Sequence, residues 1–349
     1  MSLPKNKPPV FIIAEAGSNW KAGSAQADWR RTVELVDAAK KAGADAVKFQ
    51  TFRADTVYVP NAGTSGYLSK NGIRDSIVDL FKKFAMPYEM IPRLASYCRK
   101  QKIEFMSSFF SSEDFSAVDP WVKRHKIASY EITHPGLLKL AAKSGKPLIL
   151  STGASSHEDI AWALGYFRRS GGKSVTLMQC TAKYPAPLEA LNLQVLGEFS
   201  KRYRLPVGFS DHSAEPLVGP VAAVALGARI LEKHFTLSRS LQGPDHKFAL
   251  EPGELDRMVE AVRACEKALG DGRKRVLEAE KELYLYAQRA VQAVQPIRKG
   301  ERLSEGENMA VLRPGSRRKG MHPRWMGHAQ GKKAKRAIAL GDGIRRADF

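Results

Sequence analysis

The chain has 349 residues, of which 43% are hydrophobic, and it carries a formal net charge of +20. That hydrophobic content supports a large core and excludes a disordered chain, and no apolar run approaches the roughly 20 residues needed to span a bilayer. Its three cysteines, Cys98, Cys180 and Cys265, are too few and too scattered for a disulfide framework, so we expect a cytoplasmic protein.

Eight short apolar runs precede residue 236, and each carries a polar or ionisable residue near its C-terminal end. The runs cover 10–15, 45–50, 104–109, 126–131, 147–152, 175–180, 206–212 and 229–235. Helix-like stretches separate most of them, which is typical of βα units that build a parallel sheet. A set of eight predicts a (β/α)₈ TIM barrel, because that fold gathers its reactive groups at the C-terminal ends of its strands.

The longest segment without periodicity lies between the second and third predicted strands, from Thr51 to about Ser76. It contains Gly63, Gly66 and Gly72. Long loops at the catalytic face of a barrel commonly bind the substrate or cover it. We therefore expect this insert to be a lid or a binding loop.

The barrel pattern ends near Gly270. Apolar residues at helical spacing predict a last barrel helix over 254–269, which Gly270-Asp271-Gly272 interrupts. We expect a barrel domain over 1–272, a linker over 273–287, and a small, mostly β domain over 288–349. Turn signals such as Lys299-Gly300 separate the short strand-like pieces of that last domain.

The positive charge is concentrated in the C-terminal domain. From Gln288 to Phe349 there are 15 Lys and Arg against 5 Asp and Glu, which is half of the net charge. Such an excess favours anionic ligands. No helix-turn-helix, zinc-finger or RNA-binding pattern accompanies it, so nucleic acid is not the expected partner.

Two histidines, His212 and His234, stand at the ends of the seventh and eighth predicted strands. Neighbouring strands lie about 4.8 Å apart, so both imidazoles can reach one metal ion. A single histidine at a strand end is more often a satisfied polar group, but two at matched positions predict a divalent metal site. Two protein ligands would leave positions open for substrate and water.

Two lysines, Lys48 and Lys126, lie inside apolar strand ends, where a buried ammonium group needs an anionic partner. They predict an anionic substrate, which hydroxyl groups would help to hold; the candidates are Ser108, Ser129, Ser151 and Ser210. A lysine that forms a Schiff base is the alternative, since aldolases on this fold use one.

Three carboxyl groups, those of Glu15, Glu131 and Asp245, are candidates for acid–base chemistry or for binding sugar hydroxyls. Glu15 has a simpler alternative, which is an ion pair with one of the two lysines.

These residues stand in motifs that resemble the sialic acid synthase family, which includes spore coat polysaccharide biosynthesis proteins. The motifs FIIAEAGSN, AGADAVKFQT, KIASYE, GFSDHS and EKHFTL occur in order and are followed by GPDH. Further on, IRKGERLSEGENMAVLRPG is similar to the antifreeze-like (SAF) domain that ends these enzymes. The resemblance implies an enzyme that condenses phosphoenolpyruvate with an N-acyl-mannosamine-type sugar to a nonulosonic acid, for surface polysaccharide synthesis.

The resemblance also implies roles for single residues. His212 and His234 would bind manganese or magnesium, and Arg313 would reach the N-acyl group from the partner subunit of a domain-swapped homodimer. Glu131, with Glu15 and Lys126, would be catalytic. Phosphoenolpyruvate would be held by Lys48, Lys126, Ser108, Ser129, Ser151 and Ser210, and the open-chain sugar by Gln50, Tyr184 and Asp245.

Three positions depart from the family pattern. Trp20 stands where the family usually has a histidine, Ala182 where some members have an asparagine, and Ser108 where a threonine is common. The first two leave open which sugar fits. Two alternatives also remain open: a synthase for a phosphorylated aldose, which the basic tail favours, and a non-catalytic carbohydrate- or polyanion-binding protein, which only Trp20 and Ala182 favour.

Overall fold

The computed structural model describes residues 8–64 and 75–349. The chain divides into two compact units, Met1–Gly272 and Arg273–Phe349. In the first, eight parallel strands close into a barrel in sequence order. The strands are β1 Phe11–Gly17, β2 Ala46–Thr51, β3 Glu104–Phe109, β4 His125–Ile127, β5 Leu148–Ser151, β6 Val175–Cys180, β7 Val207–Asp211 and β8 Ile230–His234. The predicted (β/α)₈ barrel is confirmed.

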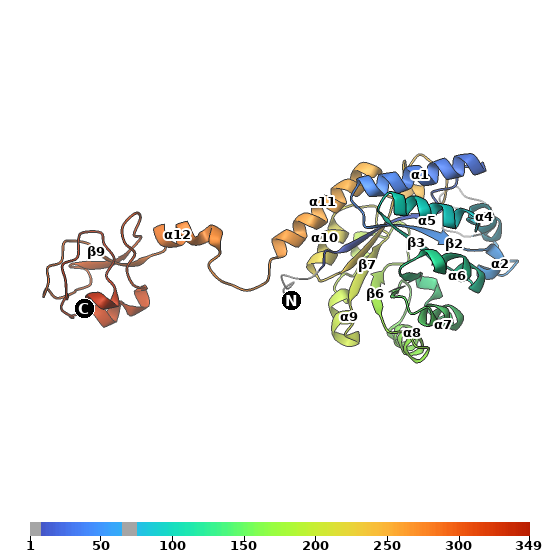
Figure 1. Cartoon of the computed structure of the whole chain (residues 1–349). Coiled ribbons are helices and arrows are strands. Elements are labelled where there is room, and N and C mark those ends of the chain that lie inside the picture. Colours follow the sequence, from blue (N-terminus) through green and yellow to red (C-terminus); the bar gives the residue numbers. More distant parts are fainter. Residues whose placement is uncertain (1–7, 65–74) are drawn as a thin grey trace. The chain divides into compact units, whose positions relative to one another are not determined.

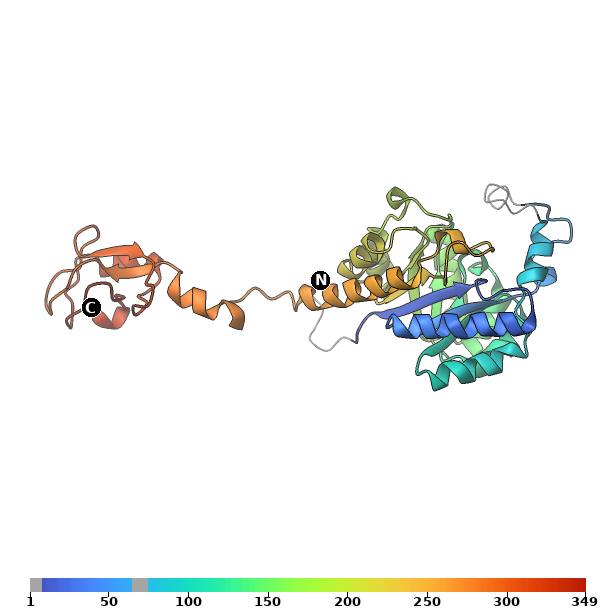
Figure 2. The same cartoon turned by 90° about the horizontal axis from the view of Figure 1, so that it is seen from above.

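Helices surround this barrel and cover the outer faces of its strands (Figure 1). The last barrel helix packs beside the first, which closes the ring of helices where the chain leaves the barrel (Figure 2). The helices of this unit are α1 Ala25–Lys41, α2 Ala54–Val57, α4 Ile77–Phe84, α5 Met90–Lys100, α6 Ser112–Val118, α7 Pro135–Lys143, α8 His157–Arg169, α9 Val195–Tyr203, α10 Val218–Ala225 and α11 Pro252–Leu269.

The inside of the barrel changes from apolar to polar along the strands. One layer is a cluster of buried apolar side chains, namely Ile13, Ala46, Met106, Ile149, Met178 and Ile230. Because side chains alternate between the two faces of a strand, the next inward-facing position lies two residues further on. Those positions hold Glu15, Lys48, Ser108, Ser151, Cys180 and Glu232. The polar residues near the ends of the predicted strands therefore form one layer inside the barrel, next to the layer of apolar side chains.

The fourth predicted strand is shorter than its sequence pattern suggests. The run over 126–131 was expected to be one strand, but β4 ends at Ile127 and Ser129–Glu131 form a 3-10 turn. The side chain of Tyr130 is 64% exposed, which a strand buried on both faces does not accommodate. Lys126 thus belongs to the strand, whereas Glu131 belongs to the loop that follows it.

With the helix that follows it, the insert after β2 extends from Phe52 to Phe84 and contains two helices, α2 and α4, in its described part. Phe52, Ile77, Leu80 and Phe84 form a small apolar cluster there, separate from the main core. Gly63 lies in the described part, whereas Gly66 and Gly72 lie outside the described residues.

The second unit contains a small antiparallel sheet with a core of its own, which confirms the small β domain. Strands β9 Ala290–Ala293 and β10 Met309–Leu312 pair so that Val291 lies opposite Val311. Two short helices, α12 Lys281–Tyr286 and α13 Met326–Ala329, accompany the sheet. Among the described residues of either unit, we find no helix that is both long and apolar enough to cross a membrane.

Candidate active site

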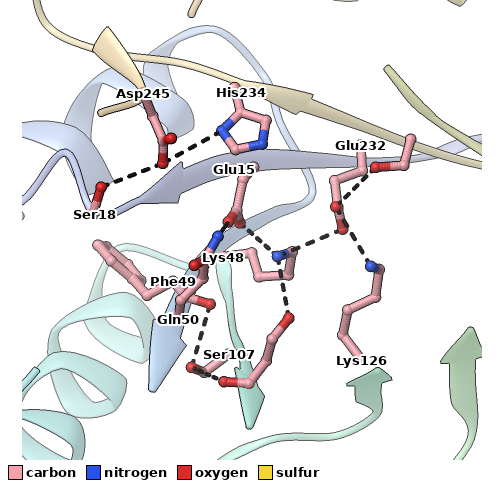
Figure 3. A network of polar contacts seen from close by, with 12 residues as sticks. Glu15, Ser18, Lys48, Phe49, Gln50, Ser107, Lys126, Glu232, His234 and Asp245 are labelled. Atoms are coloured by element: carbon pink, nitrogen blue, oxygen red, sulfur yellow. Dashed lines mark hydrogen bonds and ion pairs between the residues drawn. The ribbon is translucent and has the colours of Figure 1, made fainter. Parts of the chain in front are cut away.

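A buried network of charges lies at the C-terminal ends of β1, β2, β4 and β8 (Figure 3). The Nζ atom of Lys48 is 2.7 Å from Oε2 of Glu15 and 3.8 Å from Oε2 of Glu232. On the other side, Nζ of Lys126 is 3.6 Å from Oε1 of Glu232. All four side chains are at most 5% exposed. The two lysines were predicted to share a site, and the structure brings them together around one carboxylate.

The strand register accounts for this arrangement. Glu15 lies opposite Lys48 across β1 and β2, and it lies opposite His234 across β1 and β8. Ser108 lies opposite Lys126, and Ser210 lies opposite Glu232. The network is therefore fixed by backbone pairing.

The pKa values of the network follow from burial and from the opposed charges. Burial raises the pKa of Glu15 to about 7, although Lys48 opposes this shift. Burial would also raise the pKa of Glu232, but Lys126 and Lys48 outweigh it and hold that pKa below its ordinary value. The pKa of Lys48 is raised, because Glu15 and Glu232 outweigh the effect of burial. Burial lowers the pKa of Lys126, although Glu232 opposes this shift. Lys48 and Lys126 thus share the ionised carboxylate of Glu232, and Lys48 also pairs with Glu15.

Glu232 is the member of this network that the sequence analysis did not select. Its Oε1 accepts a hydrogen bond of 3.1 Å from Oγ of Ser210, and both lysines lie on its other sides. The sequence offered one signal: counting in twos from Ile230 puts Glu232 on the same face of β8 as His234, and Lys233 on the opposite face.

Of the predicted hydroxyl groups, that of Ser108 contacts one of the two lysines directly. Nζ of Lys48 donates to Oγ of Ser108 at 3.4 Å. Oγ of Ser129 accepts a bond of 2.9 Å from the backbone N–H of Gly153. Oγ of Ser151 is buried without a hydrogen-bond partner, which is costly unless a ligand supplies one. Ser108 and Ser210 thus contribute hydroxyl groups to the charged network, one at Lys48 and the other at Glu232.

The two predicted histidines also meet. The ring centroids of His212 and His234 are 5.5 Å apart. Burial lowers the pKa of His212 to about 4 and holds the pKa of His234 well below its ordinary value, so both rings are neutral near pH 7. Nδ1 of His212 is 2.8 Å from the carbonyl oxygen of Thr181, and this contact orients the ring.

The two histidines are chemically suited to bind a divalent cation. Nδ1 of His234 is buried without a hydrogen-bond partner and lies 3.9 Å from Oδ2 of Asp245. Sγ of Cys180 lies 3.7 Å from Nδ1 and Nε2 of His212. Neutral imidazoles are common metal ligands. No group of three or more His, Cys, Asp or Glu that could hold a metal is present within residues 8–64 and 75–349.

A cavity of about 840 Å³ opens beside the histidines, and its lining includes the three predicted sugar-binding residues Gln50, Tyr184 and Asp245. The ring of Tyr184 stacks on His212 with centroids 4.1 Å apart. Nε2 of Gln50 donates to Oε1 of Glu15 at 2.9 Å. Burial raises the pKa of Asp245 to about 6.

Gly17 makes room for Asp245 at this site. Its φ is +51°, and a Cβ at this position would lie 2.7 Å from Oδ2 of Asp245. Ser18, which the sequence analysis did not select, donates to the same oxygen at 3.3 Å. A non-glycine residue at position 17 would be strained and would displace the carboxylate.

Glu131 and Arg313 are the remaining predicted residues. Glu131 lines a smaller neighbouring cavity with Thr56 and His134, and burial raises its pKa to about 7. Arg313 follows β10 in the second unit and is exposed. Of the departures from the family pattern, Ala182 lines the 840 Å³ cavity, whereas Trp20 is buried in the core outside the strands.

Comparison with known proteins gives this site a context. Residues 35–274 match the NeuB family. The chain belongs to the NeuB family. This confirms the family predicted from the motifs.

Relatives of this NeuB-family chain extend over nearly its whole length. It is 41% identical to the spore coat polysaccharide biosynthesis protein SpsE of Bacillus subtilis, over 91% of this chain and 87% of SpsE. The crystal structure of that protein covers 100% of this chain and 99% of its own, with a TM-score of 0.64. A pseudaminic acid synthase of Campylobacter jejuni is 36% identical, over 97% of this chain and 96% of the relative.

An N,N'-diacetyllegionaminic acid synthase of Legionella pneumophila is also 36% identical, over 88% of this chain and 86% of the relative. Relatives that are synthases confirm the prediction that this NeuB-family chain is an enzyme.

Proposed function

We propose that this enzyme condenses phosphoenolpyruvate with an N-acyl-mannosamine-type sugar, giving a nonulosonic acid and phosphate. The observation that carries the proposal is the layer of Lys48, Lys126 and Glu232 at the barrel mouth, next to a cavity lined by His234 and Asp245. The first part suits a small polyanion and the second a neutral polyol. The names of the relatives, which are acid synthases, support the same reaction class.

Phosphoenolpyruvate would occupy the lysine end of the site. Its negatively charged phosphate and carboxylate groups would pair with the two ammonium groups. The serine hydroxyls would supply further hydrogen-bond donors. Glu232 would hold both lysines in place through its ion pairs with them, so that the two ammonium groups need not move when charge develops on the substrate. Ser151 would gain the hydrogen-bond partner that its buried hydroxyl lacks.

A divalent cation, Mn²⁺ or Mg²⁺, would supply a Lewis acid for the sugar aldehyde. His212 and His234 are the residues that would hold it, because both are neutral and Nδ1 of His234 has no hydrogen-bond partner. Gln50, Tyr184 and Asp245 would bind the hydroxyl groups of the open-chain sugar.

The bonds change in two stages. C3 of phosphoenolpyruvate forms a C–C bond with the aldehyde carbon, the aldehyde oxygen takes a proton, and C2 gains cationic character. Water then adds to C2 and loses its protons, and the C2–O bond breaks with phosphate as the leaving group. Glu131 is the candidate for accepting a proton or for stabilising the charge at C2, since its raised pKa of about 7 suits proton exchange. Glu15 would orient Lys48 and Gln50.

The second unit would complete the site as an antifreeze-like (SAF) domain. We place Arg313 at the N-acyl group of the sugar bound by the partner subunit, in a domain-swapped homodimer. The exposure of Arg313 and the motif resemblance support this role. The product would enter surface polysaccharide synthesis, and the reaction would take place in the cytoplasm, where phosphoenolpyruvate is made.

The test is release of inorganic phosphate from phosphoenolpyruvate with Mn²⁺ and a panel of acceptors. The panel contains N-acetylmannosamine, di-N-acetylated hexosamines and phosphorylated aldoses. We expect release with an unphosphorylated amino sugar, and its loss with a chelator or in His212→Ala and His234→Ala. Release only with phosphorylated aldoses would establish the alternative synthase, which the charge of +20 favours. No release from a folded protein would contradict both.

A further inference from the structure

The barrel unit has a second cavity, of about 1060 Å³, whose lining is strongly basic. No residue that the proposed function assigns to a substrate or to the metal lines this basic cavity. Its charged side chains come from three segments, which are the loop after β1 with α1, the segment that includes α4, and the segment after β8. They are five cations and one carboxylate, namely Lys21, Arg31, Lys83, Arg239, Lys247 and Asp75.

Carboxylates neutralise only part of this positive charge. Nζ of Lys21 lies 2.7 Å from Oδ2 of Asp28, and the guanidinium group of Arg239 pairs with Glu254. Neither of these carboxylates lines the cavity, whereas that of Asp75 does. Three carboxylates therefore accompany five cations, so that two positive charges remain in excess.

The excess includes two cations that have neutral neighbours. Arg31 donates to the backbone oxygen of Lys21, and Nζ of Lys83 lies 5.9 Å from the ring centroid of Phe84. Among the residues that the structure describes, neither Arg31 nor Lys83 forms an ion pair with a carboxylate. A phosphate monoester carries a charge of about −1.5 to −2 near pH 7, which would balance the excess.

The uncharged part of the lining suits a nucleoside. Leu80, Phe84 and Leu241 contribute apolar side chains, and Ser240 and Gln242 contribute neutral hydrogen-bonding groups. A sugar phosphate would press hydroxyl groups against the apolar side chains, where they would lose water without gaining a partner. A nucleobase has a flat face that packs on apolar and aromatic side chains, and polar edges that can bond to amide and hydroxyl groups.

The basic cavity shares two elements with the cavity beside the histidines. Leu80 and Phe84 of α4 line both cavities. In the segment after β8, Gly243 lines the basic cavity and the next residue, Pro244, lines the other. A ligand that ties α4 to this segment would therefore stabilise a wall of each cavity.

We propose that the basic cavity binds a nucleoside monophosphate, which bridges α1, α4 and the segment after β8 and so lowers KM for the sugar acceptor. The cations of these segments repel one another. A dianion between them favours the arrangement seen in the structure, in which the cavity beside the histidines is formed. The effect on KM rests on the proposed function, which places the acceptor in that cavity, whereas binding of the nucleotide does not.

Isothermal titration calorimetry of the full chain with AMP, GMP, CMP and UMP tests the site. Saturating phosphoenolpyruvate would keep the nucleotides away from Lys48 and Lys126. We expect at least one nucleotide to bind, with one molecule per chain. Lys83→Ala and Arg31→Ala should each weaken this binding by about 10-fold, because each removes a hydrogen bond to a charged group.

The matched controls are Lys82→Ala and Arg30→Ala. Each removes a like charge from the same helix, at an exposed position that does not line the basic cavity. Both controls should bind the nucleotide as the wild type does. Circular dichroism would verify that each variant is folded.

Phosphate release measures the effect on the acceptor, with the concentration of free Mn²⁺ held constant. The nucleotide should lower KM for the accepted sugar by about 5-fold or more, which is the lower end of the usual coupling between two sites, and leave kcat nearly unchanged. At the same nucleotide concentration, Lys83→Ala should lose most of this effect and Lys82→Ala should keep it.

Each contrary outcome overturns a stated part of the proposal. No binding by these nucleotides, or equal affinity in folded Lys83→Ala and Arg31→Ala, would overturn the site. Inorganic phosphate that binds there as tightly as the nucleotide would overturn the nucleoside as the ligand. Binding with an unchanged or raised KM would overturn the regulation. Absence of phosphate release with every acceptor would overturn the proposed function and the regulation, whereas the calorimetry would still decide the site.

Discussion

At the scale of single residues, the site contains side chains whose pKa values burial has shifted from their ordinary values. His212 is neutral because its pKa is lowered to about 4, and Glu15 exchanges its proton near pH 7. Each shift arises mainly from desolvation. Such shifts arise because polar side chains at the strand ends are buried together at the mouth of the barrel, away from water. Perturbed pKa values of this kind cluster at functional sites.

Glu131 gives a prediction about pH. Burial raises its pKa from 4.5 to about 7, so its carboxyl group loses its proton as the pH rises from 6 to 8. If the carboxylate accepts a proton or stabilises the charge at C2, kcat should rise over this interval with an apparent pKa of about 7. We expect Glu131→Gln to lower kcat by roughly 100-fold and to abolish this rise.

The measurement is kcat against pH for the wild type and for Glu131→Gln, with saturating substrates. A variant with near wild-type turnover and an unchanged pH profile would remove Glu131 from the mechanism. For stability the sign is opposite: a carboxyl group whose pKa is raised on folding lowers the free energy of unfolding as the pH rises from about 4.5 through 7.

At the scale of elements, the loop after β7 is fixed by a second buried ion pair on the outer face of the barrel strands. Nζ of Lys233 lies 2.7 Å from Oδ2 of Asp211 and donates to the backbone oxygens of Ser213 and Glu215 at 2.6 and 2.9 Å. Lys233 and Asp211 are each 1% exposed. This pair positions the loop that begins with His212.

Removing this lysine should destabilise the fold. Lys233→Met leaves the Asp211 carboxylate buried without its cation, and breaking a buried pair in this way costs about 3–5 kcal/mol. Urea denaturation would measure the loss in the free energy of unfolding. Adding Asp211→Asn should recover part of it, and Lys267→Met, at an exposed site on α11, should change stability by less than about 0.5 kcal/mol. A loss below about 1 kcal/mol in Lys233→Met would contradict this role for the pair.

The sequence predicted the elements better than the details of their ends. Eight strands and the last barrel helix follow from apolar periodicity, and β7 and β8 start and end within a residue or two of their predicted bounds. The fourth strand was predicted too long, because an apolar run does not reveal where Tyr130 turns toward solvent. Tertiary contacts decided that boundary.

The same limit applies to the site. The polar strand ends could be found from sequence, and the order of the strands makes Glu15 and Lys48 neighbours, but only the structure gives the register that pairs them. Glu232 was missed because it is adjacent to Lys233, and only the inward-facing alternation from Ile230 distinguishes the two. The apolar cluster of the insert could not be predicted, because Phe52 and Phe81 are far apart in sequence and meet only through the fold of the insert.

At the scale of the whole molecule, the chain joins a catalytic barrel to a small basic unit. The barrel provides the lysines, the histidines and the cavity, and the second unit, with Arg313, has its own core around Val291, Leu303 and Ile344. A core of this size is marginal by itself, so a small domain gains by packing on another surface. A partner subunit would provide one.

Mixing two impaired variants tests this assignment. In a domain-swapped homodimer, His234→Ala inactivates the barrel that carries it, and Arg313→Ala weakens the site of the partner barrel. Unfolding and refolding the two variants together should form heterodimers with one intact site and restore phosphate release. No gain over the separately refolded variants, with heterodimers verified by a purification tag, would contradict a swapped Arg313.

The most direct test of the central claim follows the bridging oxygen of phosphoenolpyruvate. With ¹⁸O between C2 and phosphorus, the account predicts that the label leaves with inorganic phosphate, while mass spectrometry detects a nonulosonic acid containing the carbon atoms of both substrates. Label retained in the organic product, or pyruvate formed in place of a nine-carbon acid, would contradict the account.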